Sequence, residues 1–176
     1  MSARGLLAGL LLSGLAVPVL GQALSHDANA PVDVDADHVD VQDKAGRFVW
    51  DGHVIVHQAN LVMTAPRLNG SYHRVKANVQ LDELNAQGGV TFTLENDNAH
   101  GDVAIYDLNR KIITLIGGVV LNQSGNTIRG GRLIYDVAGR HAIMDGHGPA
   151  GPNQTVGGRN QSGRVTGHFV VPQRTQ

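Results

Sequence analysis

A repeat of 29 residues in the second half of the chain limits its possible folds more than any other feature. One copy contains Gly88-Gly89-Val90, Gly101 and Ile105-Tyr106-Asp107, and the next contains Gly117-Gly118-Val119, Gly130 and Ile134-Tyr135-Asp136. An earlier copy begins at Gly52. Repeats of this length reuse one supersecondary unit, and each unit buries its apolar face only against its neighbours. The chain is therefore predicted to be a stack of similar units.

The unit is predicted to consist of antiparallel β-strands, one on each side of every repeated glycine. Short runs such as Val54-Ile55-Val56 and Val90 to Leu94 are rich in β-branched and aromatic residues and are bounded by Gly, Asn and Asp. Turn signals such as Glu95-Asn96 and Ser124-Gly125 recur along the chain. Parallel strands would need crossovers of about a dozen residues or more. Since the sequence leaves no room for these, we expect an all-β fold of consecutive antiparallel strands.

Superposing the copies predicts which side chains point into the stack. Alternate residues of a strand face the same side, so if Val54, Val90 and Val119 point inward, their neighbours two residues on do so too. The inward set is then Val54, Val56, Val90, Phe92, Val119 and Leu121, with Phe48, Trp50, Leu68, Leu84, Ala86, Ala104, Tyr106, Ile113, Leu115, Leu133, Tyr135, Ala142 and Met144 from the adjoining strands. Aromatic residues are only 4% of the chain, which predicts a mainly aliphatic interior. Such an interior suits a chain-like apolar guest.

The N-terminus predicts export. Arg4 precedes an apolar run from Gly5 to Leu20, and Gly21-Gln22-Ala23 offers small residues for a signal peptidase, so residues 1–23 are predicted to be a cleaved signal peptide. The alternative is an uncleaved membrane anchor, for which this run is short and contains Pro18. Cleavage would leave 153 residues, enough for one domain, with a net charge of about −2 and no cysteine. This charge gives no indication of nucleic-acid binding.

The ordered set of segments resembles the LptA/OstA-like family of lipopolysaccharide-transport proteins. The resemblance rests on Pro31 to Asp37, Phe48 to Val56, Leu84 to Val90, the two Gly-x-x-x-Ile-Tyr-Asp hairpins and Gly163 to Pro172. It implies a single twisted, open β jelly roll of consecutive antiparallel strands over residues 31–147. Around the roll we expect a flexible N-terminal segment at 24–30, a Gly-rich flexible segment at 148–163 and a terminal strand at 164–172.

The resemblance also implies a function, that of a periplasmic carrier without enzymatic activity. Such a carrier shields lipopolysaccharide acyl chains in an apolar groove. It joins itself head to tail and links an inner-membrane LptC-like protein to an outer-membrane LptD-like translocon. Carried over by position, the lipid-facing residues include Val32, Val34, Phe92, Tyr106 and Leu108. Combined with inward positions from the repeat, the predicted groove residues are Val32, Val34, Phe48, Trp50, Val54, Val56, Leu68, Phe92, Tyr106, Leu108, Ile113, Leu115, Leu121, Leu133 and Tyr135.

An open stack leaves unpaired backbone groups at each end, and such edges recruit strands from partners. The two edges are predicted at Val32 to Val41 and at Val165 to Val171, and contacts between these unlike ends would give open rods. The predicted partner-edge residues are Val32, Val34, Val39, Val41, Val165, Phe169 and Val171. Asp33, Asp35, Asp37 and Asp40 are interpreted as a solvated face that deters wrong pairing.

Other functional classes have weaker support in the sequence. The chain has nine histidines, but His53 and His57 lie on predicted strands at a spacing suited to a helix, so no metal site and no cofactor are expected. No Gly-x-Ser-x-Gly elbow is present. The alternative from another class is a structural or adhesive exported β-solenoid with a closed, filled interior. A membrane-anchored LptC-like relative would share the fold, but the predicted cleavable signal argues against it.

Overall fold

The computed structural model describes residues 26–147 and 163–170. Their elements are β1 (Asp33–Asp35), β2 (His38–Gln42), a 3-10 turn η1 (Asp43–Ala45), β3 (Arg47–Gln58), β4 (Leu61–Val75), β5 (Asn78–Leu94), β6 (Asp97–Asp107), β7 (Ile112–Gln123), β8 (Asn126–Asp136), β9 (His141–Asp145) and β10 (Thr166–His168). All strand pairs are antiparallel, and β3 to β8 pair in chain order. This confirms the predicted all-β fold of consecutive antiparallel strands.

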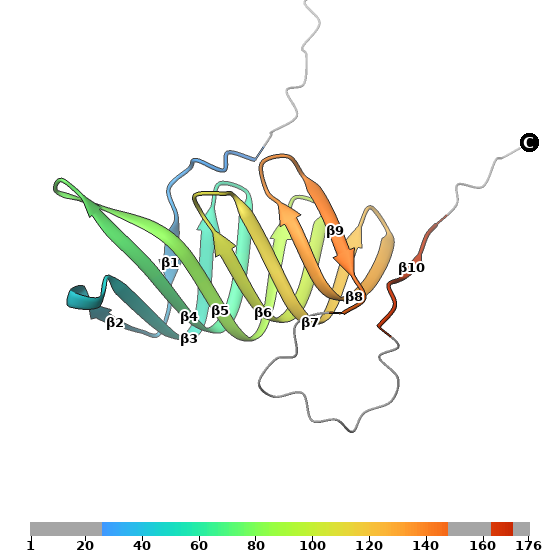
Figure 1. Cartoon of the computed structure of the whole chain (residues 1–176), viewed down its shortest axis with the longest axis horizontal. Coiled ribbons are helices and arrows are strands. Elements are labelled where there is room, and N and C mark those ends of the chain that lie inside the picture. Colours follow the sequence, from blue (N-terminus) through green and yellow to red (C-terminus); the bar gives the residue numbers. More distant parts are fainter. Residues whose placement is uncertain (1–25, 148–162, 171–176) are drawn as a thin grey trace, which may run out of the picture.

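Each of the long strands β3 to β8 bends in its middle (Figure 1). The pairing register shifts between Asp51 and Val54, between Gln87 and Val90, and between Ile116 and Val119, with equivalent shifts in the strands between them. Such bulges bend a strand sharply. The repeated glycines were expected to separate two strands. That expectation was wrong, because Gly88 and Gly117, with φ of 95° and 84°, lie inside continuous strands as corners.

The row of corners, here called the crease, folds the sheet into two facing walls. One wall has β2 and β9 at its two ends, and the other has β1 and β10. Opposite the crease lie the hairpin loops. Loops 59–60, 95–96 and 124–125 belong to the β1–β10 wall, and loops 76–77, 108–111 and 137–140 belong to the β2–β9 wall. The line along which these two rows face each other is called the seam. Figure 1 shows the hairpin loops gathered along the upper side of the roll.

The space between the walls holds the core. Every inward position predicted for the strand segments that follow the corners is buried, including Val90, Phe92 and Leu121. Alternate residues such as Ile55 and Val103 are exposed or half-buried on the outer surface. These observations confirm the predicted register. Phe48, Trp50, Ala142 and Met144, near the two ends of the roll, are only half-buried because fewer strands cover them.

The predicted signal peptide, residues 1–23, lies outside the described residues, and three other predicted segments lie partly outside them. Of the predicted flexible segment 24–30, residues 26–30 pack against the hairpin loops and contribute Ala28 to the core, while the flexibility itself stays a prediction. The Gly-rich segment lies outside the described residues up to position 162. The predicted strand at 164–172 contains β10, which pairs with β8 from Thr127 to Arg129. The part of the chain that the structure describes contains no helix long and apolar enough to cross a membrane.

Candidate lipid-binding interior

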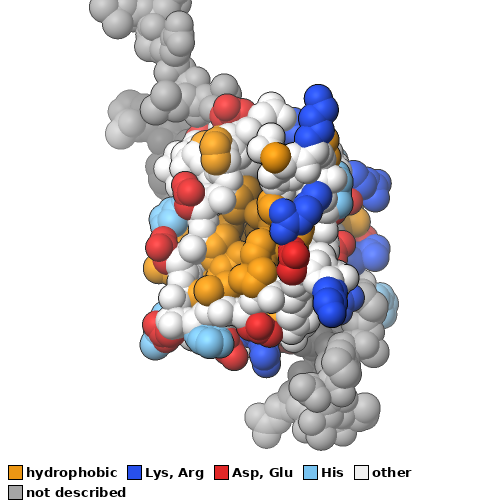
Figure 2. All heavy atoms as spheres, turned by 90° about the vertical axis from the view of Figure 1, so that its left-hand side faces the viewer, with side chains coloured by type: hydrophobic (Ala, Val, Ile, Leu, Met, Phe, Trp, Pro, Cys, Tyr) orange, Lys and Arg blue, Asp and Glu red, His pale blue; other side chains and the backbone are white. Residues whose placement is uncertain are grey.

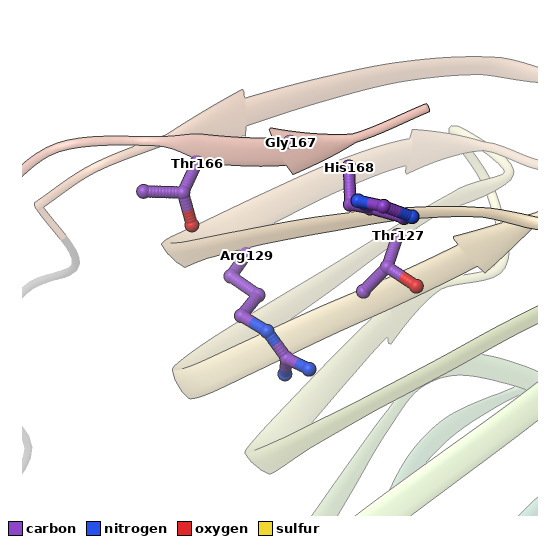
Figure 3. A pocket seen from close by; sticks show the side chains of 5 residues that line it. All are labelled: Thr127, Arg129, Thr166, Gly167 and His168. Carbon is purple, nitrogen blue, oxygen red and sulfur yellow. The ribbon is translucent and has the colours of Figure 1, made fainter. Parts of the chain in front are cut away.

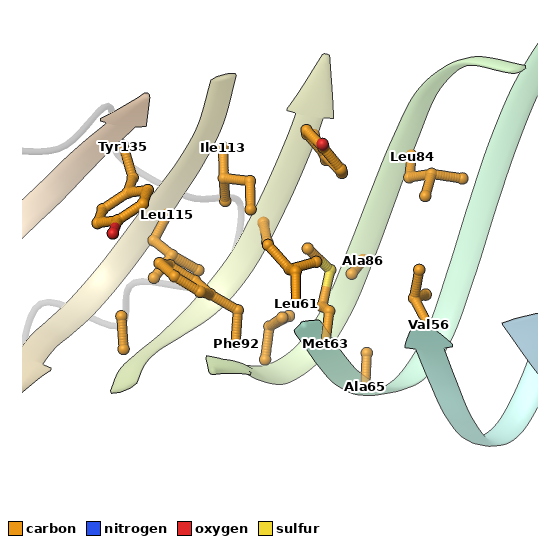
Figure 4. Close-up of a cluster of buried hydrophobic side chains, with 14 of the residues drawn as sticks. Val56, Leu61, Met63, Ala65, Leu84, Ala86, Phe92, Ile113, Leu115 and Tyr135 are labelled. Carbon is orange, nitrogen blue, oxygen red and sulfur yellow. The ribbon is translucent and has the colours of Figure 1, made fainter. Parts of the chain in front are cut away.

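The interior between the walls is a continuous apolar core (Figure 4). Leu84 and Phe92, on the two halves of β5, and Leu115 of β7 point into the same space and have no exposed surface. Zero accessibility means that no water molecule can touch these side chains, so their neighbours fill the space around them. Among the predicted groove residues, the fully or almost fully buried ones are Val54, Val56, Leu68, Phe92, Tyr106, Ile113, Leu115, Leu121, Leu133 and Tyr135.

The remaining predicted groove residues lie at the margins of this core. Val32, Val34, Trp50 and Leu108 are half-buried and pack against it. Phe48 is half-buried at the β1–β2 end, where its ring lies 4.5 Å from that of Tyr72 and 5.1 Å from that of Trp50 between centroids. The structure therefore brings all fifteen predicted positions into or beside one apolar interior. Their contact with lipid stays a prediction.

The interior reaches the surface at the end of the roll formed by β1, β2 and the β4–β5 hairpin. Figure 2 shows hydrophobic side chains gathered in the middle of this end and charged side chains around them. Several hydrophobic residues of this end are exposed, namely Val39, Val41, Val75 and Val79. An exposed apolar area with a polar rim is typical of a surface that binds another molecule.

Two buried tyrosines join the walls across the seam. The Tyr106 hydroxyl, from the β2–β9 wall, donates a hydrogen bond to Gln58 Oε1 of the other wall at 2.5 Å. Its repeat counterpart Tyr135 donates to Asp97 Oδ2 at 2.8 Å, and Gln123 Nε2 donates to the same oxygen at 3.0 Å. The repeated Ile-Tyr-Asp motif thus has a shared structural role. Sequence reasoning placed both tyrosines inside but missed Gln58 and Asp97, which lie 48 and 38 residues away from them in the chain.

Charged and polar groups near the loops extend these links. Arg140 Nη1 donates to Glu95 Oε2 at 2.5 Å, and Arg140 Nη2 lies 3.8 Å from Asp97 Oδ2. The Asp97 carboxylate is only 2% exposed, but it accepts hydrogen bonds from Tyr135 and Gln123, so its burial is compensated. The arrangement holds polar groups along the seam and leaves the interior below it apolar.

Burial raises the pKa of both seam tyrosines to about 12, and the neighbouring Asp97 adds to the effect at Tyr135. Both hydroxyls are therefore protonated donors at neutral pH. A tyrosine whose pKa is higher in the folded chain than in the unfolded one stabilises the fold below the unfolded value of 10.0. That contribution disappears as the pH rises from about 10 to about 12.

We accordingly expect the roll to lose stability between pH 10 and pH 12. Tyrosinate absorbance and circular dichroism should change together in this window, because the two buried hydroxyls ionise only when the walls part. The double variant Tyr106→Phe, Tyr135→Phe should lose most of the late absorbance change. Ionisation of all three tyrosines near pH 10, with the circular dichroism unchanged, would contradict this expectation.

The predicted partner edges lie at opposite ends of the roll. Val32 to Val41 is divided between β1 and β2, which pair with the two halves of β3 and so belong to different walls. At the other end, β9 and β10 pair with the two halves of β8. Val165 and Phe169 flank β10 and are exposed, whereas Val171 lies outside the described residues. The role of these edges in pairing stays a prediction.

The outer surface has a hollow that, unlike the apolar interior between the walls, is lined by polar residues (Figure 3). It lies between β8 and β10 and is lined by Thr127, Arg129, Thr166, Gly167 and His168. Ile128, between two of the lining residues, packs against the core, so Thr127 and Arg129 point away from it. The hollow is therefore too polar and too far outside the walls to hold acyl chains.

The described residues contain no group of three or more His, Asp or Glu side chains that could hold a metal ion. His53 pairs with Asp37 at 2.7 Å, and both side chains are largely exposed. The aspartates of β1 and β2 are exposed, as expected for a solvated edge.

Comparison with known proteins identifies the relatives of this roll. Residues 33–140 match the family model described as "LptA/(LptD N-terminal domain) LPS transport protein". The chain belongs to this family. The match covers the strands from β1 to β8, including both walls, the crease and both seam tyrosines.

Two further similarities agree with membership of the LptA family. The chain is 26% identical over 121 residues to the lipopolysaccharide export system protein LptH of Pseudomonas aeruginosa, which covers 65% of this chain and 67% of LptH. The fold resembles the crystal structure of LptH, described as the LptA-homologous periplasmic component of the lipopolysaccharide transport device of that organism. The TM-score is 0.68 at 21% identity, over 84% of this chain and 99% of the other. The open jelly roll is thus the fold of this family.

Proposed function

We propose that this LptA-family protein is a periplasmic, non-enzymatic carrier that holds the acyl chains of lipopolysaccharide between its two walls. The observation that carries the proposal is the continuous apolar interior, whose margin is exposed to solvent at the β1–β2 end. Each methylene transferred from water to such an interior gains about 0.8 kcal/mol, so one acyl chain has several kcal/mol favouring its burial. Family membership supports lipopolysaccharide as the guest.

The two ends of the roll support a bridge of several copies joined head to tail. Exposed aspartates at the β1–β2 end, Asp33, Asp35, Asp37 and Asp40, face solvent, whereas Arg129, Arg164 and His168 are exposed at the β10 end. A contact between unlike ends would allow these aspartates to pair with these arginines, and the unpaired edges of the outer strands would then continue the sheet. Since the ends differ, the assembly does not close on itself.

The same edges would join the terminal copies to an LptC-like protein of the inner membrane and an LptD-like translocon of the outer membrane. A similar interior in each successive protein gives the guest a similar free energy, so movement along the bridge has no preferred direction of its own. The sequence contains no Gly-x-x-x-x-Gly-Lys loop for a nucleotide. The driving energy would therefore come from an upstream partner.

Site-specific photocrosslinking in living cells tests the carrier role. A photoreactive residue at Phe92 or Leu121, inside the roll, is expected to form adducts with lipopolysaccharide. The matched controls are the adjacent outward positions Thr91 and Val120, which should form none. Equal labelling of inner and outer positions would show that lipid does not use the interior. Absence of adducts at all four would favour the structural β-solenoid.

A further inference from the structure

An acyl chain can enter the interior only if the walls move apart. Phe92, Tyr106 and Leu115 are entirely inaccessible to water, and a protein interior packed in this way has few voids larger than a water molecule. The structure therefore shows the roll in a closed form without room for lipid. Loading requires an opening along the crease, along the seam or at an end.

The crease cannot be the opening. The six strands β3 to β8 pass through it as continuous chain, and they remain hydrogen-bonded to one another on both sides of their corners. Separating the walls there would break main-chain pairing in every strand. The seam is different, because among the described residues no main-chain hydrogen bond joins a hairpin loop of one wall to a hairpin loop of the other. Within the described residues, the direct contacts between the two rows of loops are made by side chains.

These side-chain contacts form two groups. Near β8 and β9, Tyr135 and Arg140 of the β2–β9 wall contact Asp97 and Glu95 of the β1–β10 wall. Near β3 and β6, Tyr106 contacts Gln58. Each contact is a hydrogen bond or ion pair that water can replace when the walls part.

Residues 26–30, here called the strap, lie across the second group. Figure 1 shows this segment running along the same side of the roll as the hairpin loops. His26 Nδ1 lies 2.6 Å from Asn60 Oδ1 of the β1–β10 wall, and Lys111 Nζ of the β2–β9 wall donates to Asn29 Oδ1 at 2.5 Å. The strap therefore touches both walls, and Ala28, which is 8% exposed, closes the core beneath it.

Gln58 connects the strap to the seam tyrosine. Its Oε1 accepts from the Tyr106 hydroxyl, while its Nε2 donates to the carbonyl oxygens of Ala28 and Ala30 at 3.2 and 3.0 Å. The side chain is only 3% exposed and uses both ends of its amide. Displacing the strap thus leaves the Gln58 amide unsatisfied and weakens its hold on Tyr106.

The closed strap also contains a feature that favours its release. His26 is 9% exposed, and its Nε2 has no hydrogen-bond partner within the described residues. A buried polar atom without a partner is destabilising, and lifting the strap would return this nitrogen to water. A few polar contacts therefore hold the strap in place, while the desolvation of His26 Nε2 favours its release.

We propose that acyl chains load sideways through the seam, and that the strap with the Gln58–Tyr106 pair is the latch that must be displaced first. This inference rests on the proposed carrier function. Sideways loading keeps the polar head of the lipid in water throughout, because only the acyl chains pass between the loops. The polar side chains that line the seam would then face the sugars and phosphates of the loaded lipid.

A reversible clamp across the seam tests the proposal. The chain has no cysteine, so Glu95→Cys and Arg140→Cys supply the only thiols. A short bismaleimide linker with a cleavable disulfide would join the two walls at side chains that touch each other in the closed form. The control pair, Asn122→Cys with Thr127→Cys, is linked in the same way. Its side chains touch at 2.8 Å but lie on the same wall, so that link leaves the seam free.

Loading is measured with purified lipopolysaccharide and a photoreactive residue at Phe92. We expect the seam clamp to reduce adduct formation at least tenfold, reduction of the linker to restore it, and the control clamp to change it little. Full loading of the clamped chain would show that lipid enters from the ends and overturn the proposal. No adduct with the unclamped chain would instead overturn the carrier function itself, so the two failures are distinguishable.

Latch variants give a second, independent measurement. Deleting residues 24–30 and, separately, Tyr106→Phe should each speed adduct formation at Phe92 several-fold, because they remove latch contacts without narrowing the interior. Tyr72→Phe is the matched control, since its hydroxyl bonds to Asp43 at the β1–β2 end, away from the seam. Unchanged or slower loading in both latch variants, with folding intact by circular dichroism, would contradict the role of the strap.

Discussion

Leu115→Ala is expected to lower the free energy of unfolding by about 2–5 kcal/mol, because it opens a cavity in the middle of the packed interior. Leu115 has no exposed surface and lies between Ala104 and Leu133 on the neighbouring strands. Denaturant unfolding followed by circular dichroism measures the change. In a chain of this size the midpoint of thermal unfolding should fall by about 2–4 °C for each kcal/mol.

The adjacent variant Thr114→Ala is the control for this experiment. Thr114 lies on the outer surface of the same strand and is half-buried, so its replacement should cost less than about 1 kcal/mol. A cost for Leu115→Ala as small as that of Thr114→Ala would mean that the interior is loosely filled. The closed, tightly packed form of the roll would then be wrong.

Gly117→Ala is expected to destabilise the roll by about 2–3 kcal/mol, through two additive effects at the crease. Its φ of 84° is unfavourable for any residue with a Cβ, which alone costs about 1–2 kcal/mol. In addition, a Cβ at this position would lie 2.9 Å from Asp102 Cβ and closer still to the carboxylate of that residue. The same unfolding measurement applies.

Gly118→Ala separates the two effects. Gly118 also has a positive φ, 52°, but a Cβ there would meet no atom within 4 Å. We expect a smaller loss at this position, from backbone strain alone. Equal losses at Gly117 and Gly118 would show that the contact with Asp102 relaxes freely and that the corner is not crowded.

The repeat made most of the fold predictable from the sequence. Because equivalent positions must share an environment in every copy, the amino-acid sequence alone assigns Val54, Val90 and Val119 to one side of their strands. The corners were predicted to be chain reversals because short glycine-containing pairs occur at both kinds of site. Gly88-Gly89 lies at a bulge inside a strand, whereas Ser124-Gly125 forms a hairpin loop. Only the pairing of the next strand distinguishes a bend from a reversal of the chain.

The seam could not be predicted in the same way. Gln58 and Asp97 are polar residues near strand ends, a position where polar residues usually face water. Their burial results from tyrosines on the opposite wall, and it depends on how two distant parts of the sheet approach each other. The strap was expected only as a flexible segment, since His26 to Ala30 has no periodicity that would relate it to the repeat.

Because the corners in the second half of the chain repeat after 29 residues, the roll can be lengthened or shortened by whole repeats. Because Gly88 and Gly117 occupy equivalent corners, a chain without residues 88–116 would join the first half of β5 directly to the second half of β7. Every remaining long strand would still pair with antiparallel neighbours, point the same residues inward and bend at its corner. The two ends would also be unchanged, so a longer or shorter protein could offer the same edges to the same neighbours. Copy number within one chain and the number of chains in the proposed bridge would thus be two ways of spanning the same distance.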